Sequence, residues 1–94
     1  MESVRSDIAG ARLAALQTNL KTRGVLTRLD GDALAVLDTD TGEQVDTITC
    51  KPWPVDRDAL WFFDCTDAPV AEAGDVIGAA VAVLGTLARS RARA

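Results

Sequence analysis

Hydrophobic and polar residues change their spacing twice along the chain. From residue 3 to residue 22, apolar residues recur every three or four positions among good helix formers, and no proline interrupts them. From residue 25 the period falls to two, as in β-strands, and turn residues separate the apolar runs. From about residue 75 the helical spacing returns. This order predicts a single α+β domain over residues 1–94, in which two helices and an antiparallel sheet form a two-layer sandwich.

Turn and cap residues set the expected boundaries. Gly24 follows Lys21 and Arg23 and suits the C-terminal stop of the first helix. Asp30-Gly31 is a hairpin signal. The predicted elements are a helix over 3–22, strands over about 25–29, 33–37, 44–50 and 59–63, a loop from Lys51 to Asp58, and a helix over about 75–91. Two helices can cover one face of such a sheet and leave the other face open.

The segment 66–73 allows two interpretations. Pro69 can open the last helix at its first position, or residues 69–72 can form a short edge strand, where proline is tolerated. We favour the edge strand because Asp75 is a better N-cap than Ala68. The sheet is therefore expected to have four or five strands.

Each predicted helix carries more than one set of apolar or small residues. In the first helix, Leu13, Leu16 and Leu20 form one stripe, and Val4, Ile8, Ala11 and Ala15 form a second stripe on nearly the opposite side. The second stripe is explained by a bend at Gly10, by fraying of the first turns, or by contact with a second chain in a homodimer. The expected core face of the last helix is Val76, Ile77, Ala80, Val81, Leu84 and Leu87. Its small residues Gly78, Ala82 and Gly85 are expected to pack against the first helix, with a dimer contact as the alternative.

The aromatic residues are the main candidates for a binding surface. Leu60 and Phe62 are predicted to point to one face of their strand, and Trp61 and Phe63 to the other, so both faces are apolar. One face serves the core, and a loop such as that of Trp53, a terminal segment or a second protein must cover the other. Trp53 lies between two prolines and either folds over the core as a lid or meets a partner. The predicted partner-binding residues are Trp53, Trp61 and Phe63, with a charged rim of Asp56, Arg57 and Asp58.

Composition and charge narrow the function. The net charge is −4, and residues 24–67 carry ten acidic and three basic residues, a net −7, which argues against a nucleic-acid-binding face there. The longest uncharged run, Val76 to Ala88, is shorter than the about 20 residues that span a membrane, and the N-terminal segment lacks the apolar stretch of a secretory signal. We therefore expect a cytoplasmic protein. Histidine and tyrosine are both absent, which removes common acid–base groups, so we do not expect an enzyme.

The cysteines and a cluster of acids are weak candidates for chemistry. If the loop after Cys50 centres on Val55, Cys50 and Cys65 lie about five positions apart along the strand pair, roughly 15 Å, which is too far for a disulfide. Two thiols without histidine also fall short of the usual four zinc ligands. Asp38, Asp40, Gly42 and Glu43 resemble the start of a calcium loop, but Thr49 occupies the position of the last carboxylate, so a solvated turn is favoured. No cofactor or metal is expected.

Three segments resemble a known group of proteins. Ile48-Thr49-Cys50-Lys51-Pro52, Leu60-Trp61-Phe62-Phe63 and Pro69-Val70-Ala71-Glu72-Ala73 are similar to the core of small actinobacterial proteins of unknown function. The resemblance covers about residues 48–85. Relatives of this kind are often encoded near helix-turn-helix regulators, so the resemblance implies a role as an accessory to a transcriptional regulator. The family pattern often has glycine where this chain has Asp67-Ala68.

These features predict a non-enzymatic module that binds another cytosolic protein and forms a homodimer, without nucleic-acid or membrane partners. The alternative is a small-molecule-binding domain in which the same aromatic residues line a pocket on the sheet face.

Overall fold

The first helix ends in the backbone motif that its sequence predicts. The computed structural model of the protein describes residues 2–93, with side chains for residues 7–90 and 92. Helix α1 runs over Glu2–Thr22. Gly24 follows it with a φ of +78°, and the N–H groups of Gly24 and Val25 each donate over 3.0 Å to the carbonyls of Lys21 and Leu20. This pair of bonds is a Schellman motif, which needs a residue that tolerates the left-handed conformation.

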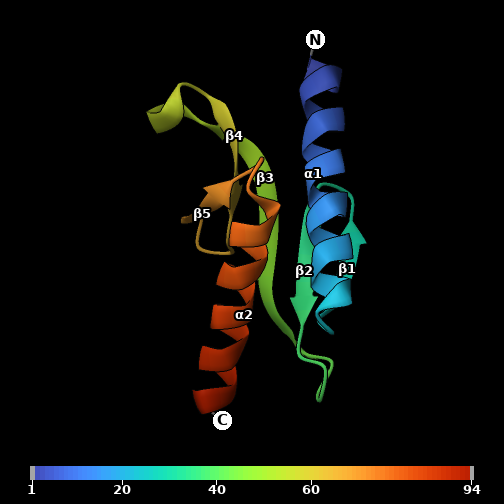
Figure 1. Ribbon diagram of the computed structural model, residues 1–94. Helices are drawn as coiled ribbons and strands as arrows, with labels where there is room; N and C mark the ends of the chain where they lie inside the picture. Colours follow the sequence, from blue (N-terminus) through green and yellow to red (C-terminus); the bar gives the residue numbers. More distant parts are fainter. Residues whose placement is uncertain (1, 94) are drawn as a thin grey trace.

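Five consecutive strands then form one antiparallel meander (Figure 1). Its order is β1-β2-β3-β4-β5, and every strand pairs with its neighbour along the chain. Helix α2 follows, and the N–H of Gly78 donates to the side chain of its cap Asp75 over 3.0 Å, as expected. The edge strand preferred for residues 69–72 is confirmed. The elements after α1 are β1 (Leu26–Asp30), β2 (Ala33–Leu37), β3 (Gln44–Trp53), a short 3-10 helix η1 (Pro54–Asp56), β4 (Ala59–Phe63), β5 (Pro69–Glu72) and α2 (Val76–Arg93).

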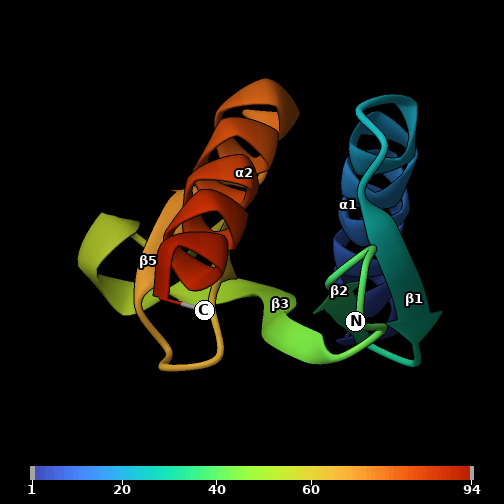
Figure 2. The ribbon, with the colours of Figure 1, turned by 90° about the horizontal axis from the view of Figure 1, so that it is seen from below.

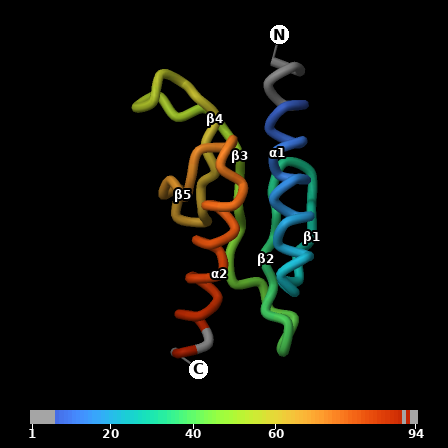
Figure 3. Tube along the Cα trace, in the orientation of Figure 1, coloured from blue at the N-terminus to red at the C-terminus, as the bar shows by residue number. Residues whose placement is uncertain are grey.

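Both helices lie on the same side of the sheet, as Figure 2 shows from below. Helix α1 contacts β1, β2 and β3, α2 contacts β5, and the two helices contact each other. The predicted two-layer α+β architecture is therefore confirmed. The opposite side of the sheet, which we call the open face, has no helix over it in the described part of the chain. The tip of the β3–β4 hairpin extends away from both helices (Figure 3).

The core lies between the helices and the sheet. The α1 stripe of Leu13, Leu16 and Leu20 is fully buried, as predicted. From the sheet, the fully or almost fully buried side chains are those of Leu34, Val36, Ile48 and Phe62. In the second stripe of α1, Ile8, Ala11 and Ala15 are exposed, and the side chain of Val4 lies outside those described.

The predicted core face of α2 is partly wrong. Ile77 and Val81 are 62% and 55% exposed, whereas Ala79 and Val83 are buried. Apolar residues surround most of this helix, so the spacing alone does not fix which side faces the sheet. Residues 76, 79, 80, 83 and 87 share the face that meets the core, and this leaves 77 and 81 in solvent.

The small-residue stripe of α2 also has a different role from the one expected. A side chain built at Gly85 would meet only Arg89 within 4 Å, and no atom of α1. Ala82 and Gly85 instead line a cavity beside Val70 of β5. At Gly78, an added Cβ would meet the capping carboxylate of Asp75. The stripe therefore does not form the contact between the two helices.

Strand β3 is longer than predicted and includes Pro52. The segment from Lys51 to Trp53, expected to be a loop, continues the strand and pairs with β4. The pairing of β2 with β3 ends at Thr49, so β3 has no neighbour on that side at Pro52. The carbonyl of Leu60, which lies opposite Pro52, accepts from Ala73 in the direction of β5. Pro52 and Leu60 therefore form a pair of residues that exchange no hydrogen bonds with each other. The strand loses no hydrogen bond by having proline, which lacks an N–H, at this position.

Candidate functional site

The two faces of β4 divide its large side chains as the sequence predicts. Phe62 is fully buried, lies opposite Cys50 and packs in the core. Its neighbours Trp61 and Phe63 must then point to the open face, because successive strand residues alternate. Trp61 lies opposite Lys51 of β3, so the side chain of Lys51 is on the open face too.

Three aromatic side chains gather on the open face. The ring centroids of Trp53 and Trp61 are 4.8 Å apart, and those of Trp53 and Phe63 are 6.3 Å apart, both edge to face. Such pairs each stabilise by about 0.5–1.5 kcal/mol beyond their buried area. We call Trp53, Trp61 and Phe63 the aromatic cluster. Phe63 is only 3% exposed, whereas both tryptophans are half-buried.

Trp53 was expected either to fold over the core as a lid or to meet a partner, and its position excludes the lid. Trp53 is the last residue of β3 and alternates with Lys51 onto the open face. It packs on Trp61 and Phe63, not on the core between the sheet and the helices. Trp53 is therefore not a lid over that core, and part of its surface remains accessible to a partner.

Of the predicted rim residues, Asp56 is built into the cluster. The indole N–H of Trp61 donates to Oδ2 of Asp56 over 2.8 Å, and this bond is partly buried. It fixes the orientation of the Trp61 ring. Arg57 and Asp58 are exposed in the turn that follows, with left-handed φ values of 53° and 60°. The N–H of Asp58 donates to the carbonyl of Trp53 and closes the hairpin.

Lys51 is a residue of the site that the sequence analysis missed. Its ammonium group lies 4.9 Å from the centroid of the Phe63 ring and forms an ion pair with Asp67. A cation over an aromatic ring stabilises by about 0.5–1 kcal/mol at an exposed site. The signal was the alternation of Lys51 with Trp53, but it is informative only if β3 is extended through Pro52.

A hollow of about 400 Å³ adjoins the cluster. Thr47 and Thr49 of β3 form its floor, and carboxylates stand around it. Glu72 of β5 lies opposite Trp61 on the other side of the cluster. The open face thus has an apolar aromatic centre and an acidic surround, which is the anatomy of many protein interfaces. The acidic residues around the hollow are Asp32, Asp64 and Asp67.

The two cysteines are free and neither is activated. Cys50 lies opposite Phe62, which centres the hairpin on Asp56 and not on the expected Val55. Burial of Cys50 raises its pKa to about 11, and the positive charge of Arg12 offsets this only in part. The pKa of exposed Cys65 is also raised, because its thiol hydrogen-bonds to the Asp46 carboxylate and lies near negative charge. Both groups are thiols at neutral pH and are poor nucleophiles in that form.

The resemblance to a calcium loop corresponds to an ordinary turn. Oδ1 of Asp38 accepts the N–H groups of Asp40 and Thr41 over 2.8 and 3.2 Å, and Gly42 has a φ of +74°. The carboxylate thus supports the backbone of the hairpin. Over residues 2–93, no group of three or more His, Cys, Asp or Glu side chains could hold a metal ion. Neither described helix has the length and apolar character needed to cross a membrane.

No protein-family model, curated protein or solved structure matches this chain.

Proposed function

We propose that this protein is a non-enzymatic, cytoplasmic interaction module that binds a partner protein through the open face of its sheet. The observation that carries the proposal is the aromatic cluster. Three of the four aromatic residues of the chain lie on the face that neither helix covers. Tryptophans placed in this way are the residues that most often dominate binding energy at interfaces.

The surroundings of the cluster indicate how a partner would dock. Trp53 and Trp61 are half-buried and held by each other and by Asp56, so little side-chain entropy is lost when a partner covers them. An apolar side chain of the partner would cover the rings, and its polar groups would meet the acidic surround. A transcriptional regulator is the first partner to test, since the resemblance to regulator-associated actinobacterial proteins implies such a role.

The second stripe of α1 supports a homodimer as part of the same proposal. Ile8 is 44% exposed, and Ala11 and Ala15 continue its exposed side of the helix. A second copy on this side would leave the open face accessible, because α1 lies in the other layer. Sedimentation equilibrium of the full chain measures the mass of the particle, and a monomer at all concentrations would contradict this part.

Affinity capture tests the partner proposal. The tagged full chain is incubated with the cytosol of its native cell, and bound proteins are identified by mass spectrometry. Trp61→Ala should lose a stoichiometric partner, with more than about 2 kcal/mol of binding free energy removed if Trp61 is an anchor. Val81→Ala is the matched control, because Val81 is 55% exposed in the helix layer. Equal capture by wild type and by folded Trp61→Ala would refute the proposed surface.

The hollow beside Lys51 favours one alternative, a small-molecule site on the same face. Lys51 lines this hollow but none of the three aromatic residues does, so a ligand there would affect the tryptophans through Lys51, whose ammonium lies over the Phe63 ring beside them. A saturable fluorescence response to one purified metabolite, without any captured protein, would support this alternative over the interaction module.

A further inference from the structure

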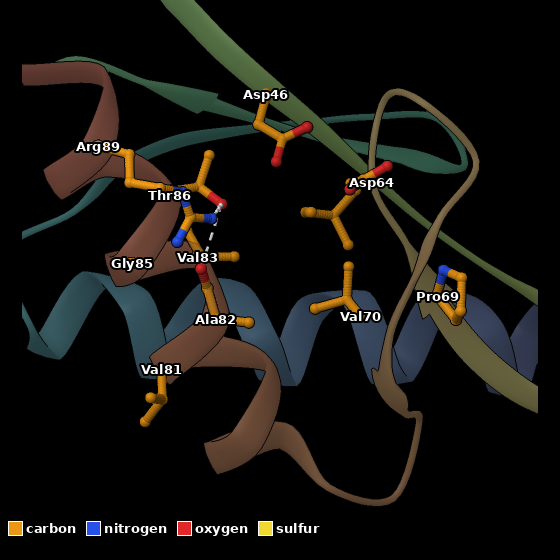
Figure 4. A pocket seen from close by; sticks show the side chains of 11 residues that line it. Asp46, Asp64, Pro69, Val70, Val81, Ala82, Val83, Gly85, Thr86 and Arg89 are labelled. Carbon is orange, nitrogen blue, oxygen red and sulfur yellow. Dashed lines mark hydrogen bonds between the residues drawn. The ribbon is translucent and has the colours of Figure 1, made fainter. Parts of the chain in front are cut away.

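A second cavity lies in the other layer of the molecule, between α2 and the sheet (Figure 4). It has a volume of about 350 Å³. Its walls come from the start of β3, from the segment around β5 and from the later turns of α2. The cavity stays open partly because Ala82 and Gly85, with little or no side chain, face it. This volume corresponds to about a dozen water molecules and lies at the lower end for ligand pockets.

A buried carboxylate stands at one edge of this cavity. Asp46 is only 6% exposed. Its Oδ1 accepts the N–H groups of Thr47 and Cys65 over 2.8 and 3.0 Å, which leaves Oδ2 without a backbone donor. Figure 4 shows one oxygen of this carboxylate pointing into the space. The carboxylate also accepts from the thiol of Cys65. Among the described side chains the ion pair is that of Lys51 with Asp67, so Asp46 is hydrogen-bonded but has no cationic partner.

A guanidinium group stands on another wall. Nη2 of Arg89 donates to Oγ1 of Thr86 over 3.2 Å, and the hydroxyl of Thr86 donates to the carbonyl of Ala82. Figure 4 shows Arg89 and Thr86 across the space from Val70 and Asp64. Arg89 and Asp46 form no ion pair with each other. The cavity therefore presents a carboxylate and a guanidinium that are separated by open space.

The surface between these two charges is aliphatic. Ile48, Val70 and Val83 contribute it. Asp64 also borders the cavity, and its Oδ1 accepts the N–H and hydroxyl of Thr66 and the N–H of Ala68. Asp46 is the more deeply buried of the two carboxylates, so a bound cation stabilises it more. Asp46 and Arg89 are therefore the charged groups that a ligand would meet first.

We propose that this cavity binds a small zwitterion, namely a free α-amino acid with an aliphatic side chain. Its ammonium group would pair with Asp46, and its carboxylate would accept from Arg89, which offers a fork of N–H donors. Its side chain would lie against Val70 and Val83. The bound ammonium would supply the counter-ion that the buried carboxylate lacks. This site is separate from the aromatic cluster and does not depend on the function proposed for the open face.

Calorimetric titration of the purified full chain with L-leucine tests the proposal. Isoamylamine, which lacks the carboxylate, and isocaproate, which lacks the ammonium, are the matched ligands. Leucine should bind with a Kd below about 1 mM, and each analogue should bind at least tenfold more weakly. No heat of binding with leucine at about 10 mM, or equal affinity for all three compounds, would overturn the proposal.

Two substitutions locate the site. Asp46→Asn removes the charge but keeps an oxygen that can accept from Thr47 and Cys65. Arg89→Gln changes an exposed side chain and leaves the fold of α2 in place, so it tests the site independently of Asp46. Each should weaken leucine binding at least tenfold, whereas Asp40→Asn in the exposed turn should not change it. Leucine binding at wild-type affinity in both variants would show that the amino acid does not bind here.

Discussion

Replacing Trp61 by alanine tests whether the aromatic cluster is a surface feature or part of the core. Trp61 faces the open side of the sheet, contacts Trp53 at a centroid distance of 4.8 Å and donates to Asp56 over 2.8 Å. Phe62, its neighbour in the chain, is fully buried on the helix side. Phe62→Ala is therefore a matched control of similar size change, one residue away and on the opposite face.

The structure gives different expectations for the two variants. Trp61→Ala loses an aromatic pair worth about 0.5–1.5 kcal/mol beyond its buried area and a hydrogen bond worth about 0.5–1.5 kcal/mol. It also loses the burial of a half-buried side chain, worth about 1–1.5 kcal/mol, so the total is about 2–4.5 kcal/mol. Phe62→Ala leaves a cavity in the core and should lower the free energy of unfolding by about 3–5 kcal/mol. A domain of 94 residues is stable by about 5–14 kcal/mol. Trp61→Ala should therefore remain folded.

Urea unfolding followed by far-UV circular dichroism measures both losses, because this signal does not depend on the tryptophan removed. A double-mutant cycle of Trp61→Phe with Asp56→Ala isolates the hydrogen bond, and its coupling energy should be about 1 kcal/mol. If Trp61→Ala loses more stability than Phe62→Ala, or is unfolded without urea, Trp61 is a core residue. The interface proposed for the open face would then be wrong.

Four further predictions concern the backbone, the thiols and the titrating groups. Gly24→Ala should lower the free energy of unfolding by about 1 kcal/mol because of its positive φ, whereas Gly10→Ala, where an added Cβ meets nothing within 4 Å, should raise it by up to about 1 kcal/mol; urea titration of both variants checks this. Ellman's reagent should modify Cys65 in the native state and Cys50 only on unfolding. The pKa of Cys50 is raised to about 11 from 9.0, so the thiol stays protonated in the folded protein at pH values where it ionises in the unfolded chain. The free energy of unfolding is therefore at its full value below pH 9 and falls by at most about 3 kcal/mol as the pH rises towards 11. Cys50→Ala should show a shallower loss over this range. Three hydrogen bonds from the following turn, first among them that of the Thr66 hydroxyl, lower the pKa of Asp64 from its usual 3.8. Their contribution is present above this value and is lost as the pH falls below it, so the melting temperature of Asp64→Asn should depend less on pH between about 4 and 2.

Local signals were sufficient for most of the fold. Gly24, Asp30-Gly31 and Asp75 mark a helix end, a hairpin and a helix start, and each mark rests on hydrogen bonds between close neighbours in the chain. The alternation in 59–63 likewise placed Phe62 and Trp61 on opposite faces, because it depends only on successive residues of one strand. Each of these features is determined by a few neighbouring residues, so it can be predicted from the sequence alone.

Features that depend on distant segments were predicted less well. Pro52 indicated a loop because a paired strand needs its N–H groups. However, β2 begins only at Ala33, opposite Thr49, so no strand lies beside Pro52 on that side and its missing N–H is not needed. The face of α2 was also uncertain, since Ile77 and Val83 are equally apolar and only the position of the sheet makes one of them exposed. In the site, Lys51 was missed as a consequence of ending β3 too early. Asp46 and Arg89 come from distant elements, and no local pattern links them.

The order of the sheet has a consequence for how the chain reaches this structure. Because every strand pairs with its neighbour in sequence, each hairpin closes over a short stretch of chain, and the entropy lost in each closure is small. The contact between α1 and α2 is different, since it joins the two ends of the chain. We therefore expect the hairpins to form early and the packing of the two helices to complete folding. The low proportion of distant pairings should make folding fast for a domain rich in β-strands.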